Sequence, residues 1–156
     1  MQPAFLLSLL RMAKMHGLNT VIDTCGVAPW PVLAEMLSFT DCFLYDLKLM
    51  NSDTHQHMTG RGNRLVLENY IRLKKAGAHI EVRIPVIPGV NALEKEITAI
   101  FEFLRASGRP DSIRLIPYHT SGTKKYRQLG MTMWEQEVFE LFPLDDWQAK
   151  ADRLCK

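Results

Sequence analysis

Two charged residues, Asp46 and Lys48, lie near the end of the apolar run "CFLYDLKLM" at residues 42–50. Burying either charge alone is costly, so each side chain needs a partner or a place beside solvent. Residues two apart on a strand point the same way, so a surface ion pair is the plainer interpretation. An unrelated barrel enzyme could instead use Lys48 as the amine of a Schiff base with a carbonyl substrate.

Three other segments offer side chains that could bind or react. Asp23 comes before Thr24 in "VIDTCG", Arg83 lies in "EVRIP", and His119 opens a polar loop. Each has a structural interpretation as well. Asp23 could form an Asx turn, Arg83 could pair with Glu81, and a loop histidine is more often solvated than bound to a ligand.

Metal-binding patterns are weak in this sequence. His55 and His57 form an HxH pair, but they lie in a polar stretch with no third ligand nearby. The three cysteines, Cys25, Cys42 and Cys155, are too far apart in sequence for a zinc clip or a redox pair. Their odd number is typical of free thiols in a reducing compartment, and we expect a cytoplasmic protein.

Two glycine-containing segments could suggest phosphate binding. The stretch "GRGN" at 60–63 lacks the third glycine of a dinucleotide fingerprint and follows no strand. It predicts a turn, with Asn63 as the N-cap of the next helix. The stretch "GTKKYRQLG" at 122–130 lacks the GK[ST] of a phosphate loop.

The composition indicates one ordinary globular domain. The 156 residues are 47% hydrophobic and 23% charged, with a net charge of +2. This balance gives no reason to expect binding to nucleic acid or to an anionic membrane. No apolar run approaches the roughly 18 residues of a membrane span, and the basic residues of the N-terminal segment follow its apolar part, unlike those of a signal peptide.

Hydrophobic periodicity predicts an α/β fold in which helices and strands alternate four times. Long connections between strands imply parallel neighbours in sequential order with right-handed crossovers. Helices are predicted at 4–16, 29–39, 64–76 and 92–106, strands at 19–23, 42–48, 79–87 and 112–118, loops at 50–63 and 119–130, and helical stretches at about 134–141 and 145–154.

The strands are nearly continuous in apolar residues, which favours a sheet covered on both faces. Their polar residues gather at the carboxyl ends, the edge at which α/β proteins bind ligands. Five side chains are expected at or just beyond that edge: Asp23, Asp46, Lys48, Arg83 and His119.

Four motifs occur in order along the chain: "DTCG", "YDLK", "RIPVIPG" and "PYHTSGTKKYRQLG". In this order and spacing, from about Gln2 to Gly130, the sequence resembles the activating enzymes of glycyl-radical enzymes, such as the pyruvate formate-lyase activating enzyme. These belong to the radical S-adenosylmethionine (SAM) superfamily. The resemblance implies part of a (βα)6 barrel.

The resemblance also implies cofactors and roles. In the family, SAM lies across the carboxyl ends of the strands, and a [4Fe–4S] cluster held by a CxxxCxxC loop reduces it. The resulting 5′-deoxyadenosyl radical removes a hydrogen atom from a glycine of the partner glycyl-radical enzyme. Asp46, Leu47 and Lys48 match the SAM-contacting D-x-K motif, Arg83 matches a strand-end arginine, and His119 matches a histidine near the adenosyl group.

By the same resemblance, Asp23, Thr24 and Asp46 match a site for a monovalent cation beside the SAM carboxylate. Two aspartates that face one point repel each other unless a positive charge or a proton lies between them. A bound K⁺ or Na⁺, or Lys48, is the expected solution.

Two features of the family are missing from the sequence: the CxxxCxxC loop and the Gly-Gly-Glu that receives the SAM amino group. The opening "MQPAFL" looks like the segment that follows the latter. We therefore expect the last four strands of a truncated barrel at 1–130 and a helical tail at 131–156, with no catalytic residue and no cluster. Such a chain is expected to be inactive alone and to self-associate through its uncovered strand. The alternative is a non-catalytic SAM-edge or partner-docking module.

Overall fold

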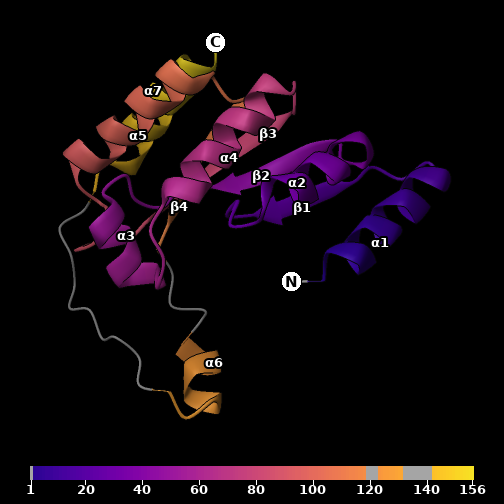
Figure 1. Cartoon of the computed structure of the whole chain (residues 1–156). Coiled ribbons are helices and arrows are strands. Elements are labelled where there is room, and N and C mark those ends of the chain that lie inside the picture. The colour runs from indigo at the N-terminus through magenta and orange to yellow at the C-terminus, as the bar shows by residue number, and fades with distance from the viewer. Residues whose placement is uncertain (1, 119–122, 132–141) are drawn as a thin grey trace.

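The computed structural model describes residues 2–118, 123–131 and 142–156. Four strands form one parallel sheet in the order β1-β2-β3-β4 (Figure 1). The prediction of sequential, parallel strands is confirmed. The strands are β1 (Val21–Thr24), β2 (Cys42–Asp46), β3 (Ile80–Val86) and β4 (Ser112–Pro117).

Helices connect and cover these strands, close to the predicted positions. They are α1 (Pro3–Met15), α2 (Trp30–Met36) with the 3-10 turn η1 (Leu37–Phe39), α3 (Ser52–Thr59), α4 (Arg64–Lys75), α5 (Glu94–Ser107), α6 (Thr123–Gln128) and α7 (Leu144–Cys155). The helix expected at 145–154 is therefore present as α7, whereas the stretch 134–141 lies outside the described residues.

Two segments predicted as loops contain helices. Helix α3 begins at Ser52 because the Asn51 side chain accepts a hydrogen bond from the Thr54 amide, and it ends at Gly60 with a φ of 81°. These are the usual N-cap and left-handed C-cap signals. The polar composition of the segment concealed them, since α3 buries only His55. The second helix is α6, within the predicted loop 119–130.

One face of the sheet forms the core. Along β3, Ile80, Val82 and Ile84 are fully buried and alternate with half-buried residues. Helices α1, α2, α4, α5 and α7 pack against this face through a shared apolar cluster that includes Tyr70 of α4 and Leu104 of α5. This arrangement follows from the period of two in a strand, which sends alternate side chains to opposite faces.

The other face is open in the described part of the chain, so the expectation of a sheet covered on both faces is wrong. Its side chains are half-buried or exposed, and several are polar: Asp23, Cys42, Asp46, Glu81, Arg83 and Arg114. The alternation of polar and apolar residues was already present in β2 and β3.

The amino ends of the strands are tied together by two similar aspartates. Asp41, just before β2, accepts hydrogen bonds from the Thr20 amide at 2.7 Å and from Lys14 of α1. Asp111, just before β4, accepts from the Ile80 amide at 2.7 Å and from Lys74 of α4 at 3.3 Å. The Lys14 hydrogen bond, followed by that of the Thr20 amide, lowers the pKa of Asp41 to about 2.

The two edges of the sheet differ. Along β4, the Gln148 side chain of α7 donates to the Ile113 carbonyl and accepts from the Leu115 amide, at 2.8 and 2.9 Å. Among the described residues, no strand pairs with the other side of β1, where Val21 is 55% exposed. No helix of the part that the structure describes is long and apolar enough to cross a membrane.

Candidate functional site

Arg83 is the centre of a network of four charges on the open face. Its Nε donates to Asp46 Oδ1 at 3.0 Å, and its Nη2 lies 2.8 Å from the same oxygen. The same Nη2 also donates to Asp23 Oδ1. Lys48 Nζ lies 3.0 Å from Asp46 Oδ2. We call Asp23, Asp46, Lys48 and Arg83 the carboxyl-end network.

Strand register explains why these side chains meet. Asp46, the last residue of β2, pairs with Arg83, so both side chains lie on the same face of neighbouring strands. Asp23 of β1 pairs with Leu44, two residues before Asp46. Its side chain therefore lies on the same face as that of Asp46 but nearer the amino ends of the strands. Arg83 was expected at the end of its strand but lies in the middle of β3, which continues to Val86. It meets Asp46 because β2 ends beside it.

The network is electrically balanced, with two carboxylates facing two cations. The guanidinium supplies the positive charge that the close approach of Asp23 and Asp46 requires. Partial burial lowers the pKa of Arg83, but hydrogen bonds to Asp23 and Asp46 outweigh it and leave this pKa above its ordinary value. Arg83 thus supplies a positive charge between the two aspartates, while Lys48 pairs with Asp46 alone.

Lys48 is an unfavourable Schiff-base nucleophile in this geometry. Such a lysine needs a neutral amine, which enzymes obtain in an apolar pocket or beside another cation. The Lys48 side chain is 34% exposed and is paired with the carboxylate of Asp46. The structural interpretation of Arg83 is also replaced, because Arg83 pairs with Asp23 and Asp46 and not with Glu81.

The other three predicted site residues, Leu47, Thr24 and His119, do not belong to the carboxyl-end network. The Leu47 side chain is 2% exposed and belongs to the core, so only its backbone can face a ligand. Its amide donates to the Arg83 carbonyl at 3.0 Å. The Thr24 hydroxyl accepts from the Gly26 amide at 3.0 Å, so Thr24, and not Asp23, makes the local side-chain turn. His119 lies outside the described residues.

Three buried asparagines hold the loops next to the network, a role that the sequence analysis does not predict. Asn91 donates to the carbonyls of Lys48 and Pro85 at 2.7 Å each and accepts from the Ile87 amide at 2.6 Å. It thereby joins the loop after β2 to the loop after β3. Asn91 ends the stretch "PGVN" at 88–91, and asparagine is a residue that commonly bonds to nearby backbone.

Asn63 acts in the same way, which corrects its predicted role as a helix N-cap. It occupies the N-cap position of α4 but makes no side-chain capping hydrogen bond. It is buried, and it donates to the carbonyls of Leu49 and Met50 at 3.0 and 2.7 Å. Its amide group thus satisfies two loop carbonyls.

The loop after β1 is fixed against α4. Asn69, which is fully buried, donates to the carbonyls of Gly26 and Ala28 at 2.8 Å each. Gly26 has a φ of 72°, and a Cβ there would lie 1.7 Å from the hydroxyl of Tyr45. This hydroxyl donates to the Val66 carbonyl at 2.6 Å, and burial raises the pKa of Tyr45. Only glycine fits this turn.

His55 and His57 do not form a metal pair. The ring of His55 is buried, and its Nδ1 lies 2.6 Å from the Arg61 carbonyl and 3.0 Å from the Thr59 hydroxyl. His57 is exposed. His55 therefore closes the loop after α3, which agrees with the structural interpretation of the HxH pattern.

Known proteins resemble this chain in both sequence and structure. No family model matches the sequence. The choline trimethylamine-lyase activating enzyme of Oleidesulfovibrio alaskensis is 37% identical over 141 residues, covering 88% of this chain and 44% of that protein. The isethionate sulfite-lyase activating enzyme of Nitratidesulfovibrio vulgaris is 42% identical over 130 residues, covering 82% and 42%. The chain thus spans less than half the length of these relatives.

Solved structures agree on the fold. A crystal structure of a domain of a pyruvate formate-lyase activating enzyme from Bacteroides vulgatus matches with a TM-score of 0.75 and 29% identity, covering 99% of this chain and 85% of that one. The radical SAM enzyme HemN from Escherichia coli matches with a TM-score of 0.62 at 8% identity, which bears on the fold alone.

The four parallel strands with helices on one face are thus part of the α/β fold found in radical SAM enzymes. Within that class, the homologues of this chain are activating enzymes of glycyl-radical enzymes, at 29–42% identity. The family suggested by the four sequence motifs is confirmed.

Proposed function

We propose that this chain forms part of a glycyl-radical-enzyme activating enzyme, namely the part that presents the SAM-facing edge of the barrel. The observation that carries the proposal is the carboxyl-end network on the open face of the sheet. In a homologue of activating enzymes, this is the edge at which α/β barrels bind their ligands.

The free hydrogen-bonding capacity of the network suits an amino acid group. Lys48 uses one donor for Asp46, and Arg83 uses Nε and Nη2, so both retain donors for a ligand carboxylate. The Asp23 side chain is 62% exposed and can accept from an ammonium or a ribose hydroxyl. We assign SAM contacts to Asp46, Lys48 and Arg83, to the backbone of Leu47, and to His119. Asp23, Thr24 and Asp46 remain the proposed contacts for a monovalent cation.

SAM bound in an activating enzyme supplies the 5′-deoxyadenosyl radical, which requires electrons from a [4Fe–4S] cluster. The cysteines of this chain do not suit that cluster: Cys25 follows β1, Cys42 opens β2 and Cys155 ends α7. A cluster needs several thiolates around one point. We therefore propose that these 156 residues alone do not cleave SAM.

The substrate of the complete activity is, by this proposal, a glycine in a glycyl-radical enzyme.

The free edge of β1 could bind a second copy of this chain. An unpaired strand edge is a template for pairing with another chain, and Val21 adds exposed apolar surface there. We propose self-association through β1, which a rising apparent mass in concentration-dependent light scattering tests; a monomer at all concentrations argues against it.

SAM binding to the full chain tests the proposed site. Isothermal titration calorimetry with SAM is expected to show binding that Lys48→Met and Arg83→Met each weaken at least tenfold. The matched control is Lys75→Met, since Lys75 is an exposed lysine at the end of α4. Equal affinities of the chain and both network variants would refute the site.

A second measurement tests the proposed inactivity. After anaerobic incubation with iron and sulfide, the chain is expected to retain no stoichiometric cluster and to release no 5′-deoxyadenosine from SAM in the presence of dithionite. Retention of a full cluster by the monomer, with product formation, would overturn this part without affecting the binding result.

A further inference from the structure

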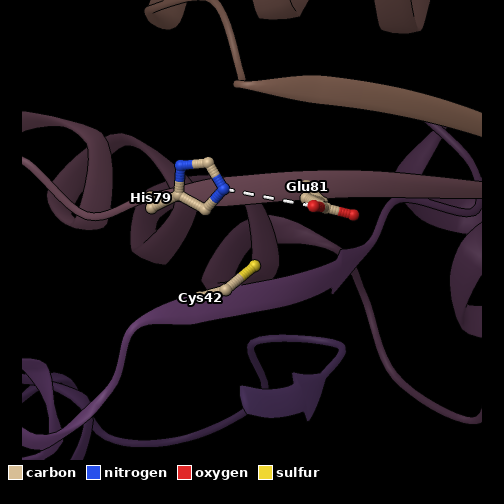
Figure 2. Close-up of side chains that lie close together, drawn as sticks. All are labelled: Cys42, His79 and Glu81. Atoms are coloured by element: carbon tan, nitrogen blue, oxygen red, sulfur yellow. Dashed lines mark ion pairs between the residues drawn. The ribbon is translucent and has the colours of Figure 1, made fainter. Parts of the chain in front are cut away.

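A second group of chemically capable side chains lies at the opposite end of the open face. Cys42 begins β2, His79 directly precedes β3, and Glu81 is the second residue of β3. Phe43 pairs with Ile80, so the residues just before them, Cys42 and His79, are neighbours. We call Cys42, His79 and Glu81 the amino-end cluster. Figure 2 shows the Cys42 sulfur directed toward the other two side chains.

The ligand atoms of the cluster are nearly close enough for one metal ion. The Cys42 sulfur, a ring nitrogen of His79 and a carboxylate oxygen of Glu81 all lie within 4.8 Å of one another. His79 Nε2 and Glu81 Oε1 are 4.0 Å apart. In a tetrahedral zinc site, with bonds of about 2.0–2.3 Å, such atoms lie roughly 3.3–3.6 Å apart. Side-chain rotations that move each atom by about 1 Å would close this difference.

The environment of His79 is an independent indication of metal binding. Its Nδ1 lies 3.0 Å from Asp111 Oδ1, while Asp111 Oδ2 is engaged by the Ile80 amide and Lys74. A carboxylate on Nδ1 orients the ring and leaves the lone pair of Nε2 free toward Glu81. Metal-bound histidines almost always have a second-shell partner of this kind.

The comparison with Asp41 strengthens this point. Asp41 makes a similar tie, but its two oxygens are both used, Oδ1 by Lys14 and Oδ2 by Thr20. At Asp111 a single oxygen accepts both the strand amide and the lysine, and the other is left for His79. The second oxygen therefore has an orienting role that the tie between strands does not require.

The donor set and its exposure define the class of ion. Thiolate, imidazole and carboxylate together are typical zinc ligands, whereas magnesium and calcium prefer oxygen alone. The side chains of His79 and Glu81 are 49% and 39% exposed, so a fourth position faces solvent. Cys42 and Asp46 lie at opposite ends of β2, about 13 Å apart at 3.3 Å per residue, which separates this cluster from the carboxyl-end network.

We propose that Cys42, His79 and Glu81 form a zinc site with water as the fourth ligand, and that Asp111 orients His79. The site joins the starts of β2 and β3. It is independent of SAM and of the iron–sulfur chemistry, so its test involves neither.

Cobalt(II) is the probe, because a thiolate ligand gives it a strong near-ultraviolet charge-transfer band and tetrahedral geometry gives it intense visible bands. The experiment uses the full chain with Cys25→Ser and Cys155→Ser, which leaves Cys42 as its only thiol. We expect one equivalent of cobalt to bind with both sets of bands, and zinc to displace it. Adding Cys42→Ser is expected to abolish the charge-transfer band.

Two further variants test the other ligands. Glu81→Gln, which keeps the size of the side chain, and His79→Ala are each expected to lower zinc affinity at least tenfold. Asp111→Asn is expected to lower it about tenfold, the lower end of second-shell effects. His57→Ala is the matched control, because His57 is exposed on α3 and outside the cluster. Circular dichroism melts in chelator establish that each variant folds.

The proposal is overturned if the Cys25→Ser, Cys155→Ser chain shows no charge-transfer band. It is also overturned if that band survives Cys42→Ser, or if Glu81→Gln binds zinc as tightly as the parent. If His79→Ala fails to fold, Glu81→Gln still decides the question, since a half-exposed, isosteric substitution leaves the core intact.

Discussion

The two ends of the open face are built from the same strands but carry different chemistry. At the carboxyl end, two carboxylates face a guanidinium and an ammonium, and the charges balance within the chain. At the amino end, the thiol of Cys42, the imidazole of His79 and the carboxylate of Glu81 face one another, and all three can donate electron pairs. These differences underlie our proposals of a zwitterionic ligand at the carboxyl end and of a metal cation at the amino end.

The two ends of the open face also differ in the hydrogen bonds that hold their backbone. The carboxyl-end loops are irregular, and buried asparagines hold their backbone carbonyls. The amino-end residues lie at strand starts, where Asp41 and Asp111 bond to the amides of neighbouring strands. The comparison teaches that the loops beyond the carboxyl ends need buried side-chain ties, whereas the strand residues at both ends are placed by register. It predicts that changes at the carboxyl-end ties cost more stability than changes at the amino end.

The largest effect is expected at Gly26. Gly26→Ala places a Cβ against the Tyr45 hydroxyl, in a left-handed backbone conformation, so the free energy of unfolding should fall by about 3–5 kcal/mol. Gly17→Ala is the control, because Gly17 has a φ of 70° but nothing within 4 Å; about 1–2 kcal/mol is expected. Urea denaturation measures both. Equal losses would show that Tyr45 does not constrain the turn.

The next effect is expected at Asn91. Asn91→Ala removes partners from the Lys48 and Pro85 carbonyls and the Ile87 amide, at a cost of about 2–4 kcal/mol. Asn51→Ala, which removes an exposed helix cap, should cost about 1 kcal/mol. Thermal unfolding followed by circular dichroism compares the two. A smaller loss for Asn91→Ala than for Asn51→Ala would contradict the role given to the buried tie.

A moderate effect is expected at Arg83. Arg83→Met leaves Asp23 and Asp46 facing each other without the guanidinium, at a cost of about 1–3 kcal/mol at neutral pH. Arg114→Met is the matched control, since Arg114 pairs with Arg83 in register on the next strand and is exposed; a change within about 0.5 kcal/mol is expected. Adding Asp23→Asn to Arg83→Met should restore part of the loss in urea titrations.

The smallest effect is expected at Asp41 and depends on pH. Because the folded-state pKa of Asp41 is lowered to about 2, its stabilising contribution is complete above the unfolded value near 4 and disappears as the pH falls through about 2. Asp41→Asn should therefore destabilise the protein at pH 7 and make little difference at pH 2. Urea midpoints at the two pH values check this. A difference that stays constant with pH would exclude the charge of Asp41 as its cause.

The sequence by itself determined the order and type of the main elements and the family. Apolar periodicity placed the four strands and the helices between them, because burial of one strand face or one helix stripe is a local pattern. The four motifs at the strand ends pointed to the activating enzymes whose homology the comparisons confirmed. The convergence of Asp23 and Asp46 also followed, since parallel strands end at one edge.

Only the tertiary structure decided which side chains pair across strands. Arg83 lies between the two aspartates because β2 ends beside the middle of β3, and a strand's own sequence does not specify its offset from a neighbour. The same register unites Cys42 with His79 and Glu81, 37 or more positions away, although no cysteine clip marks them. The buried asparagines likewise bond to backbone carbonyls, which every residue possesses. A sequence therefore carries no local sign of the carbonyl that each asparagine will meet.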